Sequence, residues 1–146
     1  MRLFMPLVVL AITPASAVAD HEMEGRDIAN GRSHYETHCA ACHGPDLEGQ
    51  PNWRVPGDDG VLPAPPHDRT GHTWHHDNQL LFDYTYLGGQ AALEARGIAG
   101  FNSAMMGMQD ILTEDDVWDI LAYIRSTWPQ DVQDIQASMN PPHSEE

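Results

Sequence analysis

The sequence predicts an all-α fold with one long irregular loop between its helices. Residues 25–43, 78–87 and 113–128 carry apolar side chains at the three- and four-residue spacing of amphipathic helices. Glycines and prolines are so frequent in residues 46–74 that regular structure is not expected there. A structureless loop of this length is uncommon in a compact domain. We therefore expect it to wrap around a bound group.

The first helix is expected to begin near Gly25 and to end at Gly44. Gly31 and Tyr35 share its apolar face. A glycine in mid-helix costs about 1 kcal/mol against alanine, so its position calls for a reason. The absence of a side chain lets a second helix approach closely at Gly31.

The last long helix is the expected partner for that face. Thr113 is a suitable N-cap, and the acidic residues that follow it suit the positive end of the helix dipole. Val117, Leu121 and Ile124 form one apolar stripe, and Pro129 ends the pattern.

Shorter helices are expected between and after these two. Asp77 is a candidate N-cap for residues 78–87, which Gly88 and Gly89 should terminate. A short turn is expected at 91–96, and residues 130–139 fit a weak further helix.

Cys39 and Cys42, the only cysteines of the chain, are followed directly by His43. The spacing C-x-x-C-H is typical of covalent haem attachment. The two thiols would add to the vinyl groups of the haem, and the imidazole would bind the iron. One haem c is therefore the expected cofactor.

Three other interpretations of these cysteines compete. A thioredoxin-like redox pair should follow a strand of a βαβ unit, and no such pattern precedes Cys39. A zinc site needs a second ligand pair, which His72 and His76 offer. A disulfide across a two-residue gap is strained and leaves His43 without a role.

Residues 1–19 have the features of a secretory signal peptide. Arg2 is followed by an apolar run too short to span a bilayer, and then by small residues that favour cleavage after Ala19 or Ala17. We expect an exported protein, located in the periplasm of a bacterium. The mature part then divides into a domain at 20–129 and a C-terminal extension at 130–146, which should be partly disordered.

The chain is strongly acidic, with 22 acidic and 7 basic residues, a formal net charge of −15 and no lysine. A nucleic-acid partner is not expected, because such proteins carry basic patches. A protein partner with a basic docking surface is consistent with this charge.

With these parts placed, the chain resembles the class I cytochromes c, the small mono-haem proteins of bacterial periplasms. The resemblance covers roughly residues 25–129. It rests on Gly31, Tyr35 and the run Cys39-Ala40-Ala41-Cys42-His43-Gly44, on Leu112-Thr113-Glu114-Asp115-Asp116, and on Leu121-Ala122-Tyr123-Ile124-Arg125-Ser126. It implies that the N- and C-terminal helices cross near the haem, and that the function is one-electron transfer.

The resemblance also implies a methionine as the sixth iron ligand, in a Met-Pro run before the last helix. Here the run reads Met105-Met106-Gly107-Met108. The register from Leu112 places Met105 at the ligand position, with Met108 as the rival. Met106 and Met108 otherwise fit a space-filling role in the core. Without the proline the loop should be looser.

Several residues of the long loop are candidate haem contacts. A backbone carbonyl near Pro65 is a candidate hydrogen-bond partner for the His43 nitrogen that does not bind iron. Trp53, Arg54 and Trp74 are candidates for the haem edge and its propionates.

Four histidines, His67, His72, His75 and His76, gather around the end of the long loop. Imidazoles suit copper or zinc. The same residues are also suited to hydrogen-bond a propionate, or to serve only as polar loop residues.

The expected function is therefore a monomeric electron carrier and not an enzyme. Cys39 and Cys42 would hold the haem, and His43 and Met105 would fill both axial positions of the iron, which leaves no site for a small-molecule substrate. Two alternatives remain: a haem subunit of a larger oxidoreductase or oxidase complex, and a metal-binding module that uses the cysteines and histidines without haem.

Overall fold

The computed structural model describes residues 21–141 of the 146-residue chain. Over this range the fold contains helices and no strand, so the predicted all-α class is confirmed. The elements are η1 (His21–Met23), α1 (Ile28–His38), α2 (Ala40–His43), η2 (Thr73–His75), α3 (Asn78–Tyr86), α4 (Gly89–Ala95), α5 (Glu114–Ser126) and α6 (Gln130–Ala137). None of the described helices is long and apolar enough to cross a membrane. The predicted signal peptide lies outside the described residues.

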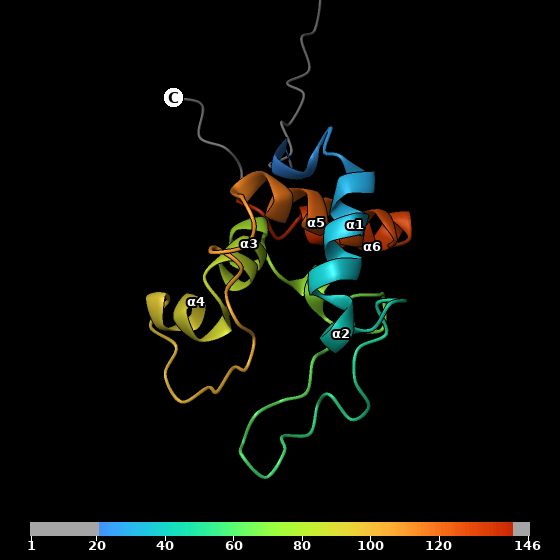
Figure 1. Cartoon of the computed structure of the whole chain (residues 1–146). Helices are drawn as coiled ribbons and strands as arrows, with labels where there is room; N and C mark the ends of the chain where they lie inside the picture. The colour runs from blue at the N-terminus through green and yellow to red at the C-terminus, as the bar shows by residue number, and fades with distance from the viewer. Residues whose placement is uncertain (1–20, 142–146) are drawn as a thin grey trace, which may run out of the picture.

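Helices α1 and α5 cross in the upper part of the molecule (Figure 1). A Cβ atom at Gly31 would overlap the backbone carbonyl of Asp119, so the two helix backbones are in direct contact there. Tyr35 lies one turn further along and is fully buried, as is Val117 on the facing helix. The predicted pairing of the glycine face with the last long helix is confirmed.

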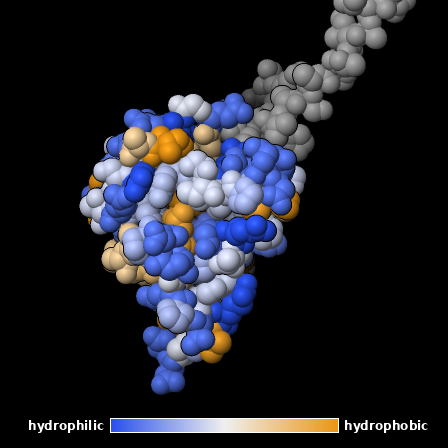
Figure 2. Space-filling model, turned by 90° about the vertical axis from the view of Figure 1, so that its right-hand side faces the viewer, coloured by the Kyte–Doolittle hydropathy of each residue, from blue (hydrophilic) through white to orange (hydrophobic). Residues whose placement is uncertain are grey.

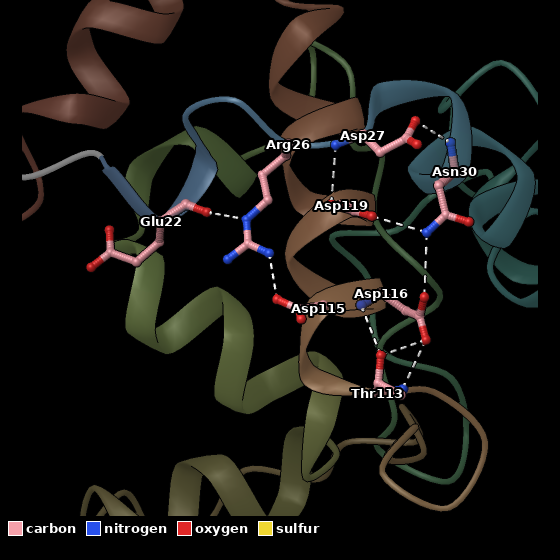
Figure 3. A network of polar contacts seen from close by, with 8 residues as sticks. All are labelled: Glu22, Arg26, Asp27, Asn30, Thr113, Asp115, Asp116 and Asp119. Atoms are coloured by element: carbon pink, nitrogen blue, oxygen red, sulfur yellow. Dashed lines mark hydrogen bonds and ion pairs between the residues drawn. The ribbon is translucent and has the colours of Figure 1, made fainter.

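A polar network closes the same crossing (Figure 3). The Asp119 carboxylate accepts hydrogen bonds from Nδ2 of Asn30 at 2.9 Å and from the backbone N–H of Asp27 at 3.2 Å. Asp27 in turn caps α1, and Thr113 caps α5 in a capping box with Asp116. The caps that start both helices therefore also join them to one another.

The first helix is interrupted earlier than the sequence predicts. Helix α1 ends at His38, and the separate turn α2 carries the last residues before Gly44. Cys39 connects α1 and α2 through its backbone. Its N–H donates to the Tyr35 carbonyl, and its own carbonyl accepts from the His43 N–H, each at 2.9 Å. The Tyr35 hydroxyl donates to the Gly44 carbonyl at 2.8 Å and fixes the end of α2. This tertiary contact is what local periodicity does not reveal.

The two glycines after α3 also act differently from the prediction. Asp77 caps α3 as expected, but Gly89 begins α4 instead of only ending the preceding helix. Gly88 lies between them with a φ of +94°, a conformation that favours glycine. The short turn expected at 91–96 is therefore the later part of a helix that starts at Gly89.

Helix α6, expected from the sequence as a weak helix, packs against η2. Gln136 is fully buried, and its Nε2 donates to Oδ1 of Asn78 at 2.7 Å and to the carbonyl of His76 at 3.2 Å. Residues 142–146 of the C-terminal extension lie outside the described residues.

The long loop hangs below the helices and forms the lower end of the molecule (Figure 1). Residues 46–72 contain no helix or strand, as predicted, but the 3-10 helix η2 takes up Thr73 and Trp74, the last two residues of the predicted loop. The loop is closed at its neck, where the N–H of Gln50 donates to Ala64 at 2.8 Å and that of His67 donates to Leu47 at 2.8 Å. The face in Figure 2 is mainly hydrophilic and narrows toward this end.

Candidate functional site

A cavity of about 720 Å³ lies between the helices and the long loop. This volume falls in the range of roughly 300–1,000 Å³ that is usual for cofactor and ligand sites. Apolar side chains from three helices form much of the wall. They are Leu80 and Leu81 of α3, Leu93 of α4, and Ile120, Leu121 and Ile124 of α5.

The C-x-x-C-H motif lies on the cavity wall. Cys39, Cys42 and His43 all line it, so the three predicted residues are brought to one site. Both cysteines are free thiols, which excludes the disulfide interpretation in this structure. Burial, with a smaller contribution from Cys42, raises the pKa of the Cys39 thiol to about 11. Cys42 is exposed and marks an open edge of the cavity.

His43 is buried and held by the long loop. Its Nδ1 lies 2.9 Å from the carbonyl oxygen of Pro65. A carbonyl can only accept, so Nδ1 carries the proton and donates, and Nε2 is left without one. Burial lowers the pKa of His43, although the bond to Pro65 acts in the opposite direction. The ring is therefore a neutral imidazole with a free nitrogen, which is the form that binds metals. The predicted contact of His43 with a carbonyl near Pro65 is confirmed.

Met105 lines the same cavity from the loop before α5. Its carbonyl accepts from the N–H of Gly89 at 3.0 Å, and its own N–H donates to Oγ of Ser103 at 3.3 Å. The Tyr84 hydroxyl also donates to Ser103, at 3.0 Å. The backbone of Met105 is thus fixed from two sides by α3 and α4. Sequence reasoning missed both Tyr84 and Ser103, because neither forms part of a motif.

The other two methionines differ from one another. Met108 is 8% exposed and belongs to the hydrophobic core, as predicted. Met106 is 67% exposed, so the prediction that it fills core space was wrong. It forms an isolated β-bridge with Gly88, and like Met108 it still lines the cavity. Gly88 and Gly107 are in such close contact that a Cβ on Gly88 would lie 2.7 Å from the Gly107 nitrogen. This contact holds the loop without the expected proline.

The three candidates for the haem edge lie in different environments. Trp53 lines the cavity. Arg54 stacks on Trp53, with its guanidinium carbon 4.1 Å from the ring centroid, and is absent from the cavity wall. Trp74 stacks on His75 at 3.7 Å and is also absent from the wall. Its buried Nε1 has no hydrogen-bond partner among the described residues.

The histidine cluster does not form a metal site in the described part of the chain. No three His, Cys, Asp or Glu side chains converge there to hold an ion. The rings instead make aromatic and polar contacts. His67 stacks on His43 at 4.1 Å, and its Nδ1 lies 2.8 Å from the hydroxyl of Thr73. The geometry therefore gives no support to a zinc or copper module that uses His72 and His76.

A model of the cytochrome c family matches residues 28–128 of the chain. The chain belongs to the cytochrome c family. The match runs from the first residue of α1 to just beyond α5 and so includes every element that lines the cavity. Neither the curated proteins nor the solved structures include one with significant similarity to this chain.

This cytochrome c is a haem protein of electron transfer, and membership of the family implies a covalently bound haem c. The site fits that group on three counts. The cavity is large and mainly apolar, Cys39 and Cys42 have the required spacing on its wall, and His43 has a free ring nitrogen beside them.

Proposed function

We propose that this cytochrome c is a one-electron carrier with His43 and Met105 as the axial ligands of one haem iron. The observation that carries the proposal is the 2.9 Å contact between Nδ1 of His43 and Pro65, in a cavity that Met105 also lines. This contact leaves Nε2 for the iron. The haem supplies an iron centre that gains and loses one electron.

Each of the proposed ligands affects the potential in a distinct way. The bond to Pro65 makes His43 a stronger donor, because it places extra electron density on the ring. A thioether from Met105 raises the reduction potential relative to a second imidazole. The apolar wall has a low dielectric constant and limits the change in solvation when the charge changes.

Turnover of a small substrate is not part of the proposal. If His43 and Met105 both held the iron, no position would be left for a substrate, which is why we propose a carrier and not an enzyme. Electrons would enter and leave at the cavity edge near Cys42, which is the exposed thiol of the motif.

The proposed partner is a redox protein with a basic docking surface. The formal net charge of −15 favours attraction to such a surface, and this attraction should weaken as salt is added. We propose a monomeric carrier in the periplasm, reached through cleavage of the signal peptide at 1–19. N-terminal sequencing of the exported protein tests the cleavage near Ala19. Co-purification of further subunits would favour the alternative, a subunit of a larger oxidoreductase complex.

The ligand assignment is tested by absorption spectroscopy of the oxidised protein. A weak long-wavelength band from sulfur–iron charge transfer should be present in the wild type and absent from Met105→Ala. Met108→Ala and Met106→Ala are the matched controls and should both keep the band. Loss of the band in Met108→Ala alone would assign the ligand to Met108. A colourless wild-type protein, expressed with a haem-attachment system, would overturn the haem proposal itself.

A further inference from the structure

The imidazole of His67 lies against the imidazole of His43, the proposed iron ligand. The two ring centroids are 4.1 Å apart, and the ring planes meet at 23°. His67 follows Pro65 by two positions, and the Pro65 carbonyl accepts from Nδ1 of His43 at 2.9 Å. The ring of His43 is therefore held along one edge by a hydrogen bond and on one face by a second aromatic ring.

These two contacts restrain different movements of the His43 ring. A hydrogen bond to Nδ1 fixes the position of that atom, but the ring can still tilt about it. A planar group against the face of the ring opposes the tilt, because tilting brings some atoms too close and costs others their contact. The stack with His67 therefore restrains the plane of the His43 ring, which the bond to Pro65 leaves less restrained.

His67 is itself firmly anchored, so it can act as a fixed surface. Its backbone N–H donates to the Leu47 carbonyl at 2.8 Å, and its carbonyl accepts from the indole N–H of Trp128 at 2.7 Å. In the side chain, Nδ1 lies 2.8 Å from the hydroxyl of the buried Thr73. The buried ring of Tyr35 meets the His67 ring edge to face, with centroids 6.3 Å apart. The His67 ring is thus fixed from the loop, from η2 and from α1.

The two stacked rings do not repel one another electrostatically. Burial lowers the pKa of both His43 and His67, so both imidazoles are uncharged at neutral pH. Both rings also line the cavity, together with Thr73. The stack therefore belongs to the wall of the haem site.

We propose that His67 is a positioning residue, which sets the plane of the imidazole that binds the iron. This inference rests on the proposed ligation by His43. In an oxidised low-spin haem, the plane of an axial imidazole decides which iron orbital holds the unpaired electron. His67 would therefore influence how spin density spreads toward the haem edge, where the electron enters and leaves.

The first test is proton NMR of the oxidised, haem-loaded protein, because the shifts of the haem methyl groups report the plane of the ligand. His67→Phe keeps a flat aromatic face and should keep the order of these shifts. His67→Leu keeps a side chain of similar size without a flat face, and it should change their order.

His75→Leu is the matched control for His67→Leu. His75 also stacks on an aromatic ring, that of Trp74 at 3.7 Å, but it is exposed and is absent from the cavity wall. Its replacement should leave the methyl shifts as they are in the wild type. The sulfur–iron band is recorded for every variant, because its retention shows that the methionine ligand is still bound.

Two results would overturn this inference and leave the carrier function intact. One is a haem-loaded His67→Leu that keeps the sulfur–iron band and the wild-type order of methyl shifts, since His67 would then only fill space. The other is an equal change in His67→Phe and His67→Leu, since the flat face would then have no role.

The second test needs no variant and so does not depend on the folding of any substitution. The reduced low-spin protein is diamagnetic, and the ring protons of His43 and His67 should show a direct through-space contact by NMR. Absence of this contact from the haem-loaded wild type would overturn the inference. Absence of bound haem from the wild type would overturn the proposed function and this inference together.

Discussion

Nδ1 of His43 and the carbonyl oxygen of Pro65 lie 2.9 Å apart, although 22 positions separate the two residues in the chain. The contact joins the C-x-x-C-H turn to the far end of the breaker-rich loop. Gly49 lies between them, since its N–H donates to the His43 carbonyl at 2.7 Å and its Cα faces the Pro65–Pro66 backbone. The orientation of His43 therefore depends on a glycine that touches both segments.

Gly49→Ala should destabilise the protein and disturb His43. The φ of Gly49 is +67°, and a side chain in that region costs about 1–3 kcal/mol. A Cβ would in addition overlap the Pro66 nitrogen and force the Pro65 carbonyl away from His43. Chemical denaturation of Gly49→Ala should therefore give a lower free energy of unfolding than that of the wild type, and the reduction potential of the haem should shift.

Gly97→Ala is the matched control for this substitution. Gly97 has a φ of +73°, but nothing lies within 4 Å of an added Cβ. Gly97→Ala should lower the free energy of unfolding through its backbone conformation alone and should leave the reduction potential unchanged. Equal stability losses and unchanged potentials in both variants would contradict the role given to Gly49.

Gly31→Ala should separate the two crossing helices. A Cβ there overlaps the Asp119 carbonyl, and the helix backbones cannot both keep their positions. Overpacking of this kind costs about 1–3 kcal/mol, which should outweigh the gain in helix propensity. Ser33→Ala, at an exposed position of α1, should change the unfolding free energy by no more than about 0.5 kcal/mol. A Gly31→Ala protein as stable as the wild type would contradict the close crossing.

Ser103→Ala should loosen the proposed ligand Met105. The hydroxyl accepts from the Met105 N–H and from Tyr84, and the loss of such a bond costs about 0.5–1.5 kcal/mol. Added imidazole should then displace the methionine faster, as measured by the loss of the sulfur–iron band in a stopped-flow experiment. Ser126→Ala, which removes an exposed hydroxyl on α5, is the control. Equal displacement rates in the two variants would show that Ser103 does not hold the loop.

Acid should weaken the fold through His67. Burial lowers the pKa of this imidazole well below its ordinary value of 6.5, and His43 and His72 lower it further. The unfolded chain then binds a proton that the folded chain does not. The stability is complete above pH 6.5 and is lost as the pH falls from there through the lower pKa of the folded state.

Denaturant unfolding at a series of pH values measures this effect. His67→Asn should show a shallower loss of stability below pH 6.5 than the wild type. His21→Asn, with a side chain 63% exposed, should follow the wild-type curve. A His67→Asn curve parallel to that of the wild type would assign the acid sensitivity to other groups.

Local chemistry decides which parts of the fold the sequence predicts well. The caps at Asp77 and Thr113 act within three residues, so their effect can be judged from neighbouring positions alone. Gly31 was also identifiable, because a glycine on an apolar helix face indicates a close contact between backbones. The break at Cys39 was not identifiable, because the helical pattern of side chains continues through it.

The C-x-x-C-H motif was determined by the sequence itself, because its three side chains lie within one helical turn. The sequence also predicted that a carbonyl near Pro65 would meet His43. Only the tertiary structure fixed the backbone of Met105 through Gly89 and Ser103 and left Met106 largely exposed. The physical reason is the long loop. Its glycines and prolines exclude regular structure, but the contacts that close the loop decide which side chains face the cavity.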